Sequence, residues 1–195
     1  MTRPYAMSVF VALQEKGLAF EMEKVDLGAR ANHSASYVSL SLTHRVPTLE
    51  HDGFALSESS AITEYLEEVF PGAPLYPADP KLKAKARQVQ AWIRSDFMPI
   101  RLECSTELIF YGLPGEPLSP AARASAEVFY TAAGALLADG QAHLFGRWSL
   151  ADVDLALMLN RLLHAGNAVP DALAQYVERQ WRHPAIQRWA QHPRP

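Results

Sequence analysis

Two short segments of this 195-residue chain hold residue types that could bind a small polar ligand. The first is Val46-Pro47, at the start of a predicted strand. A cis bond before Pro47 would turn the backbone N–H and C=O of Val46 outward into a cleft. There the two groups could pair with an extended peptide as a neighbouring strand would. On these residues alone, an ordinary trans proline opening an edge strand is the simpler interpretation.

The second segment is Glu58-Ser59, at the start of a predicted helix. The N–H and hydroxyl of Ser59 are expected near the positive end of the helix dipole, where a carboxylate ligand needs no dedicated cation. The Glu58 carboxylate is free to meet an ammonium group. On these residues alone, a plain N-cap with an acidic first turn is the preferred interpretation of this pair.

The elements that must position these residues are short and mixed up to about residue 70. Gly17 is a natural end for the first helix, and the turn signal at 51–53 predicts a hairpin. The expected elements are a helix at 5–16, a strand at 20–25, loop with a short helix at 29–42, strands at 46–49 and 54–56, and a helix at 57–69.

The second half of the chain reads as helices only. Residues 71–80 contain four prolines, which is a linker composition. The predicted helices are 81–108 (one long helix, bent at Pro99), 120–138, 149–164, 171–181 and 184–189. The segment 149–164 is apolar along its length and is expected to be the buried core helix. Ser149 and Asp152 form a capping box at its start, which is expected to be structural. The fold class is therefore an α/β domain followed by an all-α domain.

Three segments, 12–21, 45–49 and 56–66, resemble the cytosolic glutathione S-transferases in order and spacing, and 149–152 resembles the cap of that family's core helix. The likeness covers nearly the whole chain and looks closest to bacterial members with a serine-type active site. It implies a thioredoxin-like domain at 1–72, a linker at 73–80 and an all-helical domain at 81–195.

The resemblance also implies a function and a site. Glutathione is the expected co-substrate, with no permanently bound cofactor, and its thiolate would attack a small electrophile in a detoxifying conjugation. Its cysteinyl backbone would lie on Val46 before a cis Pro47, and its γ-glutamyl end on Glu58 and Ser59. Met98 and Arg101 are candidates for the second-substrate pocket, and a homodimer is expected. The alternatives are a glutathione-binding or protein-interaction module without turnover, and a glutathione-dependent peroxidase or isomerase.

The chain departs from the family pattern at its beginning. The family has a strand before the first helix, whereas only three residues precede Pro4 here. We therefore expect a truncated N-terminus that lacks this strand and leaves the strands on either side of it without a partner. The serine of the serine-type members is replaced by Arg3. The Arg3 guanidinium and the Tyr5 hydroxyl are the remaining candidates to stabilise a thiolate; Tyr5 has domain-interface packing as its alternative role.

Composition excludes several other classes. The net charge of −3 gives no footprint for nucleic acid or an anionic membrane. No apolar run approaches the roughly 18 residues of a membrane span, and no signal peptide is evident. The single Cys104 cannot form an internal disulfide, and with no export signal evident the cytoplasm is the expected location. Cys104 itself is expected to be a buried apolar filler. The seven histidines show no metal-ligand spacing, and no metal site is predicted.

Overall fold

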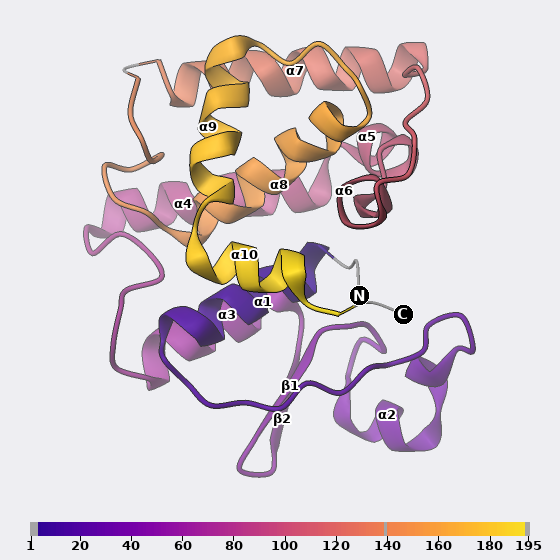
Figure 1. Ribbon diagram of the computed structural model, residues 1–195. Helices are drawn as coiled ribbons and strands as arrows, with labels where there is room; N and C mark the ends of the chain where they lie inside the picture. Colours follow the sequence, from indigo (N-terminus) through magenta and orange to yellow (C-terminus); the bar gives the residue numbers. More distant parts are fainter. Residues whose placement is uncertain (1–3, 139, 194–195) are drawn as a thin grey trace. The chain divides into compact units, whose positions relative to one another are not determined.

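A computed structural model describes residues 4–138 and 140–193 (Figure 1). The chain forms two compact units that divide between Leu75 and Tyr76. This division lies within the segment 73–80 that the sequence indicates as a linker. The first unit is mixed α/β and the second is helical, which confirms the predicted fold class.

The first unit consists of a two-stranded hairpin and the helices around it. Its elements are α1 (Pro4–Glu15), η1 (Ala31–His33), α2 (Ala35–Leu40), β1 (Thr48–His51), β2 (Phe54–Ser57) and α3 (Ser59–Val69). Helices α1 and α3 pack against each other, and α3 also contacts both strands. The strands are antiparallel, with Thr48 opposite Ser57 and His51 opposite Phe54. Asp52 and Gly53, with φ of 50° and 80°, make the tight turn between them.

The end of α1 follows the predicted pattern. Gly17 has a φ of 66°, which a glycine adopts without strain. The N–H of Gly17 donates to the carbonyl of Gln14 at 3.0 Å, and the N–H of Leu18 donates to that of Leu13 at 3.1 Å. These two bonds satisfy the last carbonyls of the helix and turn the chain out of it.

The predicted strand at 20–25 is wrong. The structure assigns no strand there, and residues 19–25 make no backbone–backbone hydrogen bond within the described chain. The apolar side of the segment does face the protein, since the Phe20 ring packs edge-on against Phe10 at 5.5 Å between centroids. The alternating sequence therefore marks a half-buried face correctly. A strand also needs a neighbour for its hydrogen bonds, and the described sheet contains only β1 and β2.

The second unit is built around one buried helix. Its elements are α4 (Pro80–Ser95), α5 (Met98–Glu103), α6 (Thr106–Tyr111), α7 (Pro120–Leu136), α8 (Leu150–His164), α9 (Asp171–Trp181) and α10 (Pro184–Gln191). Every residue from Leu150 to Leu162 is buried, which confirms α8 as the core helix. Helices α4 and α9 pack against α8 (Figure 1). Gln90 and Arg94 of α4 both donate to Asp154 Oδ2 of α8, each at 2.8 Å.

The predicted helix at 81–108 is not continuous, because the chain breaks into α4, α5 and α6; the first break lies just before Pro99, where the sequence indicated a bend. Phe97 adopts a left-handed φ of 57°, and Pro99 follows in the first turn of α5. A proline has no N–H to continue a helix and restricts the residue before it, so the break comes at its N-terminal side. The second break is at Ser105, whose side chain accepts from the N–H of Glu107 at 3.2 Å and begins α6.

The cap of α8 at Ser149 and Asp152 is confirmed and is fully buried. Asp152 Oδ2 accepts from the N–H of Ser149 at 2.9 Å and from its hydroxyl at 3.0 Å. Asp152 Oδ1 accepts from the N–H of Leu144 and from the hydroxyl of Tyr176, both at 2.8 Å. Burial raises the pKa of this carboxyl. One side chain thus joins the start of α8, the loop before it and α9.

Cys104 is fully buried, as a small apolar filler would be, and burial raises the pKa of its thiol. Within the part of the chain that the structure describes, no helix is both long and apolar enough to cross a bilayer.

Candidate functional site

The peptide bond between Val46 and Pro47 is cis, which is the geometry that the sequence interpretation requires. We call the backbone at residues 45–47 the cis-proline corner. It is held through the carbonyl of Arg45, which accepts from the Tyr37 hydroxyl at 2.9 Å and the Thr48 hydroxyl at 3.2 Å. Val46 is half-buried and lies outside the β1–β2 ladder. Its N–H and C=O make no hydrogen bond to any described residue, so both remain available to a ligand.

Glu58 stands at the start of α3 in a conformation that is rare for a residue with a side chain. Its φ is 74° and its ψ is 113°. Such backbone costs about 1–3 kcal/mol and tends to cluster at ligand sites. Its carbonyl accepts from the N–H of Ile62 at 2.9 Å, while its exposed side chain makes no capping bond. The carboxylate is therefore free to meet a cation.

Ser59 is the first residue of α3 and is 5% exposed. Its hydroxyl makes no hydrogen bond within the described residues. The first N–H groups of a helix have no intrahelical acceptor, and the helix dipole is positive there. The start of α3 therefore offers several N–H donors and one free hydroxyl to an anion.

The hairpin brings these two features to one end of the sheet. Thr48 is opposite Ser57 in the ladder. Val46 lies two residues before Thr48, and Ser59 lies two residues after Ser57. Val46 and Ser59 therefore both lie just beyond this last pair, at the same end of the hairpin. The arrangement can hold a ligand that has a peptide backbone at one point and a carboxylate with an ammonium group at another.

The structure does not bring the other predicted residues into this arrangement. Arg3 lies outside the described residues, and Tyr5 is half-buried in the first turn of α1. Met98 and Arg101 lie on α5 of the helical unit, and Met98 is 52% exposed. Arg101 Nη1 donates to the carbonyl of Arg94 at 2.5 Å, so its guanidinium closes the end of α4. The roles of these four residues in catalysis and substrate binding remain predictions.

Sequence reasoning missed two parts of the site. Tyr37, which fixes the carbonyl of Arg45, comes from a helix that carries no motif, and only the fold places it beside the cis proline. The left-handed backbone of Glu58 has no counterpart in its residue type, because positive φ is usually signalled by glycine or asparagine. Neither feature has a signal in a single sequence.

Comparison with known proteins identifies the family. Residues 2–69 match the model of the glutathione S-transferase N-terminal domain, and residues 79–192 match that of the C-terminal domain. A crystal structure of a glutathione transferase homolog from Burkholderia GL BGR1 with bound glutathione is 47% identical, covers 96% of this chain and 90% of its own, and has a TM-score of 0.78.

Curated relatives agree. A probable glutathione S-transferase of Oryza sativa subsp. japonica is 35% identical over 163 residues, which are 80% of this chain and 67% of that protein. Protein LigF of Sphingobium sp. is 39% identical over 94 residues, or 47% of this chain and 37% of LigF. The matched parts thus span about a third to two thirds of these relatives. The chain belongs to the glutathione S-transferase family, with a function of the glutathione S-transferase type and glutathione as its co-substrate.

Proposed function

We propose that this protein joins the thiolate of glutathione to a small electrophile, with the tripeptide bound at Val46, Pro47, Glu58 and Ser59. The observation that carries the proposal is the start of α3. A buried, unbonded serine hydroxyl and free helix N–H groups lie at the same end of the hairpin as the cis-proline corner.

Each part of glutathione has a matching group. The γ-glutamyl carboxylate accepts from the N–H and hydroxyl of Ser59, and its ammonium group pairs with the Glu58 carboxylate. The N–H of Val46 donates to the cysteinyl C=O, and the cysteinyl N–H donates to the C=O of Val46. Binding at both ends fixes the position of the sulfur, which is the main requirement for its attack on a second molecule.

The chemical step requires a thiolate. A thiol near pKa 8.5 ionises more easily beside a cation, a hydrogen-bond donor or a helix N-terminus. Arg3, which precedes Pro4 in the sequence, and the hydroxyl of Tyr5, in the first turn of α1, are the groups that we propose for this role. The sulfur forms a bond to an electrophilic carbon, whose leaving group departs with its electron pair, and the thiol proton passes to solvent. We propose Met98 and Arg101 for the second substrate, a homodimeric assembly and a cytoplasmic location, as the family resemblance implies.

Glutathione-dependent isomerisation is the second candidate. It is favoured by a maleylacetoacetate isomerase structure with bound malonate and glutathione, which is 26% identical, covers 100% of this chain and 95% of its own, and has a TM-score of 0.77. An isomerase uses the same thiolate but releases glutathione unchanged. Mass spectrometry of the products distinguishes the two, because only conjugation yields an adduct that contains the tripeptide.

The decisive experiment compares two neighbouring serines on α3. Calorimetric titration of glutathione into Ser59→Ala should give a Kd about tenfold weaker than wild type, because a hydrogen bond to a charged group is lost. Ser60→Ala is the matched control, since Ser60 is exposed and adjacent, and its Kd should change less than about twofold. Turnover of 1-chloro-2,4-dinitrobenzene, followed by absorbance, then tests conjugation. Absence of heat with millimolar glutathione would reject the proposal.

A further inference from the structure

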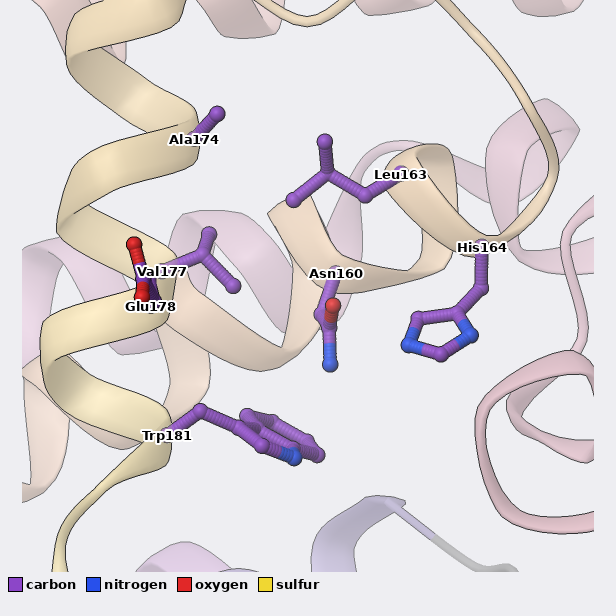
Figure 2. Close-up of a pocket in the computed structure, with 7 residues that line it drawn as sticks. All are labelled: Asn160, Leu163, His164, Ala174, Val177, Glu178 and Trp181. Atoms are coloured by element: carbon purple, nitrogen blue, oxygen red, sulfur yellow. The ribbon is translucent and has the colours of Figure 1, made fainter.

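A second site candidate lies entirely on residues of the helical unit. An open pocket of about 360 Å³ lies between α8 and α9 (Figure 2). This volume is within the range of pockets that hold small organic molecules. The lining residues are Asn160, Leu163 and His164 of α8, and Ala174, Val177, Glu178 and Trp181 of α9.

The unusual feature of this pocket is Asn160. It is 5% exposed, on a helix whose other buried residues are mostly apolar, yet its side-chain amide makes no hydrogen bond to any described residue. In Figure 2 the amide points into the open space between Trp181 and His164. Buried amide groups almost always have partners, because leaving one unpaired costs about 1–3 kcal/mol. An amide that faces an open pocket and has no partner among the described residues is available to pair with a ligand there.

The walls of the pocket are aromatic and apolar. The Trp181 indole is stacked on Phe110 of α6, with 6.4 Å between ring centroids and 28° between planes. The His164 ring lies across the opening from it (Figure 2). Burial lowers the pKa of His164, which keeps the ring neutral at physiological pH. Leu163 and Val177 add aliphatic surface.

The negative charge of Glu178, in the pocket lining, is balanced by an ion pair. Glu178, an exposed residue of α9, pairs with Arg182, which directly follows that helix. The polar groups of the pocket are therefore neutral, namely the Asn160 amide, the His164 ring nitrogens and the Trp181 indole N–H, with no free cation or anion among the remaining lining residues. Such a lining favours an uncharged ligand over a phosphate, a carboxylate or an ammonium compound.

We propose that this pocket binds a planar, uncharged heteroaromatic molecule whose edge carries an N–H donor next to a carbonyl acceptor, as in a lactam. The Asn160 amide, itself a donor beside an acceptor, pairs with that edge. The ring lies against Trp181 and His164, where aromatic contacts add to the burial of apolar surface. This binding requires no glutathione and goes beyond the proposed transferase reaction.

The test uses the full chain without glutathione and 2-quinolinone as the probe. Calorimetry should give saturable binding to the wild type, and the N-methyl derivative, which lacks the N–H donor, should bind about tenfold more weakly. In Asn160→Leu, which keeps the branching and the number of side-chain heavy atoms but removes the polar groups, 2-quinolinone should lose at least about tenfold in affinity and the two probes should become equal. Asn160→Ala repeats the test in a second background, so the outcome does not depend on one variant folding.

Location is checked by nuclear magnetic resonance. The indole N–H signal that disappears in Trp181→Phe should shift when 2-quinolinone is added, whereas the signal that disappears in Trp148→Phe, the matched control on the loop before α8, should not. Equal affinity of 2-quinolinone for wild type and both Asn160 variants would overturn the proposal. So would a shift at Trp148 in place of Trp181, or no saturable heat. None of these results would affect the glutathione site, which is measured with a different ligand.

Discussion

Replacing Asp152 with asparagine puts an NH₂ group in place of one oxygen of the buried cap of α8. Oδ1 accepts from the N–H of Leu144 and the hydroxyl of Tyr176, and Oδ2 accepts from the N–H and hydroxyl of Ser149. A hydroxyl can rotate to accept from the new NH₂ group, but a backbone N–H cannot. Whichever oxygen is replaced, one buried backbone N–H loses its acceptor.

That loss sets the magnitude. An unpaired buried donor costs about 1–3 kcal/mol. The asparagine is neutral, so it avoids the desolvation that raises the pKa of Asp152, and this offsets part of the cost. We expect Asp152→Asn to lower the free energy of unfolding by about 2 kcal/mol at pH 7. For a chain of this size that corresponds to a fall in Tm of about 4–8 °C.

The difference should also depend on pH. Because the pKa of Asp152 is raised on folding, its contribution to stability is fully present below the unfolded value of about 4 and is lost as pH rises through the folded value. The advantage of wild type over Asp152→Asn is therefore expected to be larger in acid and to shrink towards neutral pH. A neutral asparagine at this position cannot show that trend.

Urea unfolding followed by tryptophan fluorescence, at several pH values, measures both effects. Asp171→Asn is the matched control, because Asp171 is exposed in the first turn of α9, and it should change the free energy of unfolding by less than about 0.5 kcal/mol. An Asp152→Asn variant with the wild-type urea midpoint would refute the claim that the substitution leaves a buried backbone N–H without an acceptor. A gap that widens with rising pH would refute the direction of the pKa shift.

Three further predictions concern other residues. Lys16→Met should lower the free energy of unfolding by about 3 kcal/mol in urea titrations, because it leaves the largely buried Glu67 carboxylate without the ammonium group that lies 2.7 Å away; an unchanged midpoint would contradict this. The Cys104 thiol, buried and with a raised pKa, should react with iodoacetamide at least about 100-fold more slowly in the folded protein than in urea, and equal rates would show that it is accessible. Glu58→Gly should relieve the positive φ and raise the unfolding free energy by about 1 kcal/mol while weakening glutathione binding in calorimetry; a gain in both would remove Glu58 from the site.

The elements that the sequence predicted best are those with a strong local signal. The core helix at 149–164 combines an unbroken apolar run with a capping pair, and both act within the helix itself. The hairpin at 48–57 depends on a turn whose residue types match its backbone. The cis bond before Pro47 was inferred from a proline beside a strand together with the Glu58-Ser59 pair, and it is present.

Where the sequence failed, a partner distant in the chain contributes to the outcome, in addition to local breaks such as those at Pro99 and Ser105. The segment 20–25 has the alternation of a strand, but a ladder depends on another strand lying beside it. The breaks within 81–108 depend in part on Arg161 of α8, which donates to the carbonyl of Cys104 at 2.8 Å. The polar Asn160 within the apolar helix was visible in the sequence, but only the packing of α9 shows that it opens into a pocket.

The bond from Arg161 to the Cys104 carbonyl has a consequence for how the chain can change in length. A residue added or deleted at the junction of α5 and α6 would move that carbonyl out of reach and leave a guanidinium that is 5% exposed without this acceptor. The segment 112–119, by contrast, runs largely at the surface between α6 and α7. Natural relatives with longer or shorter helical units are therefore expected to differ in the 112–119 segment and to keep the spacing around Cys104.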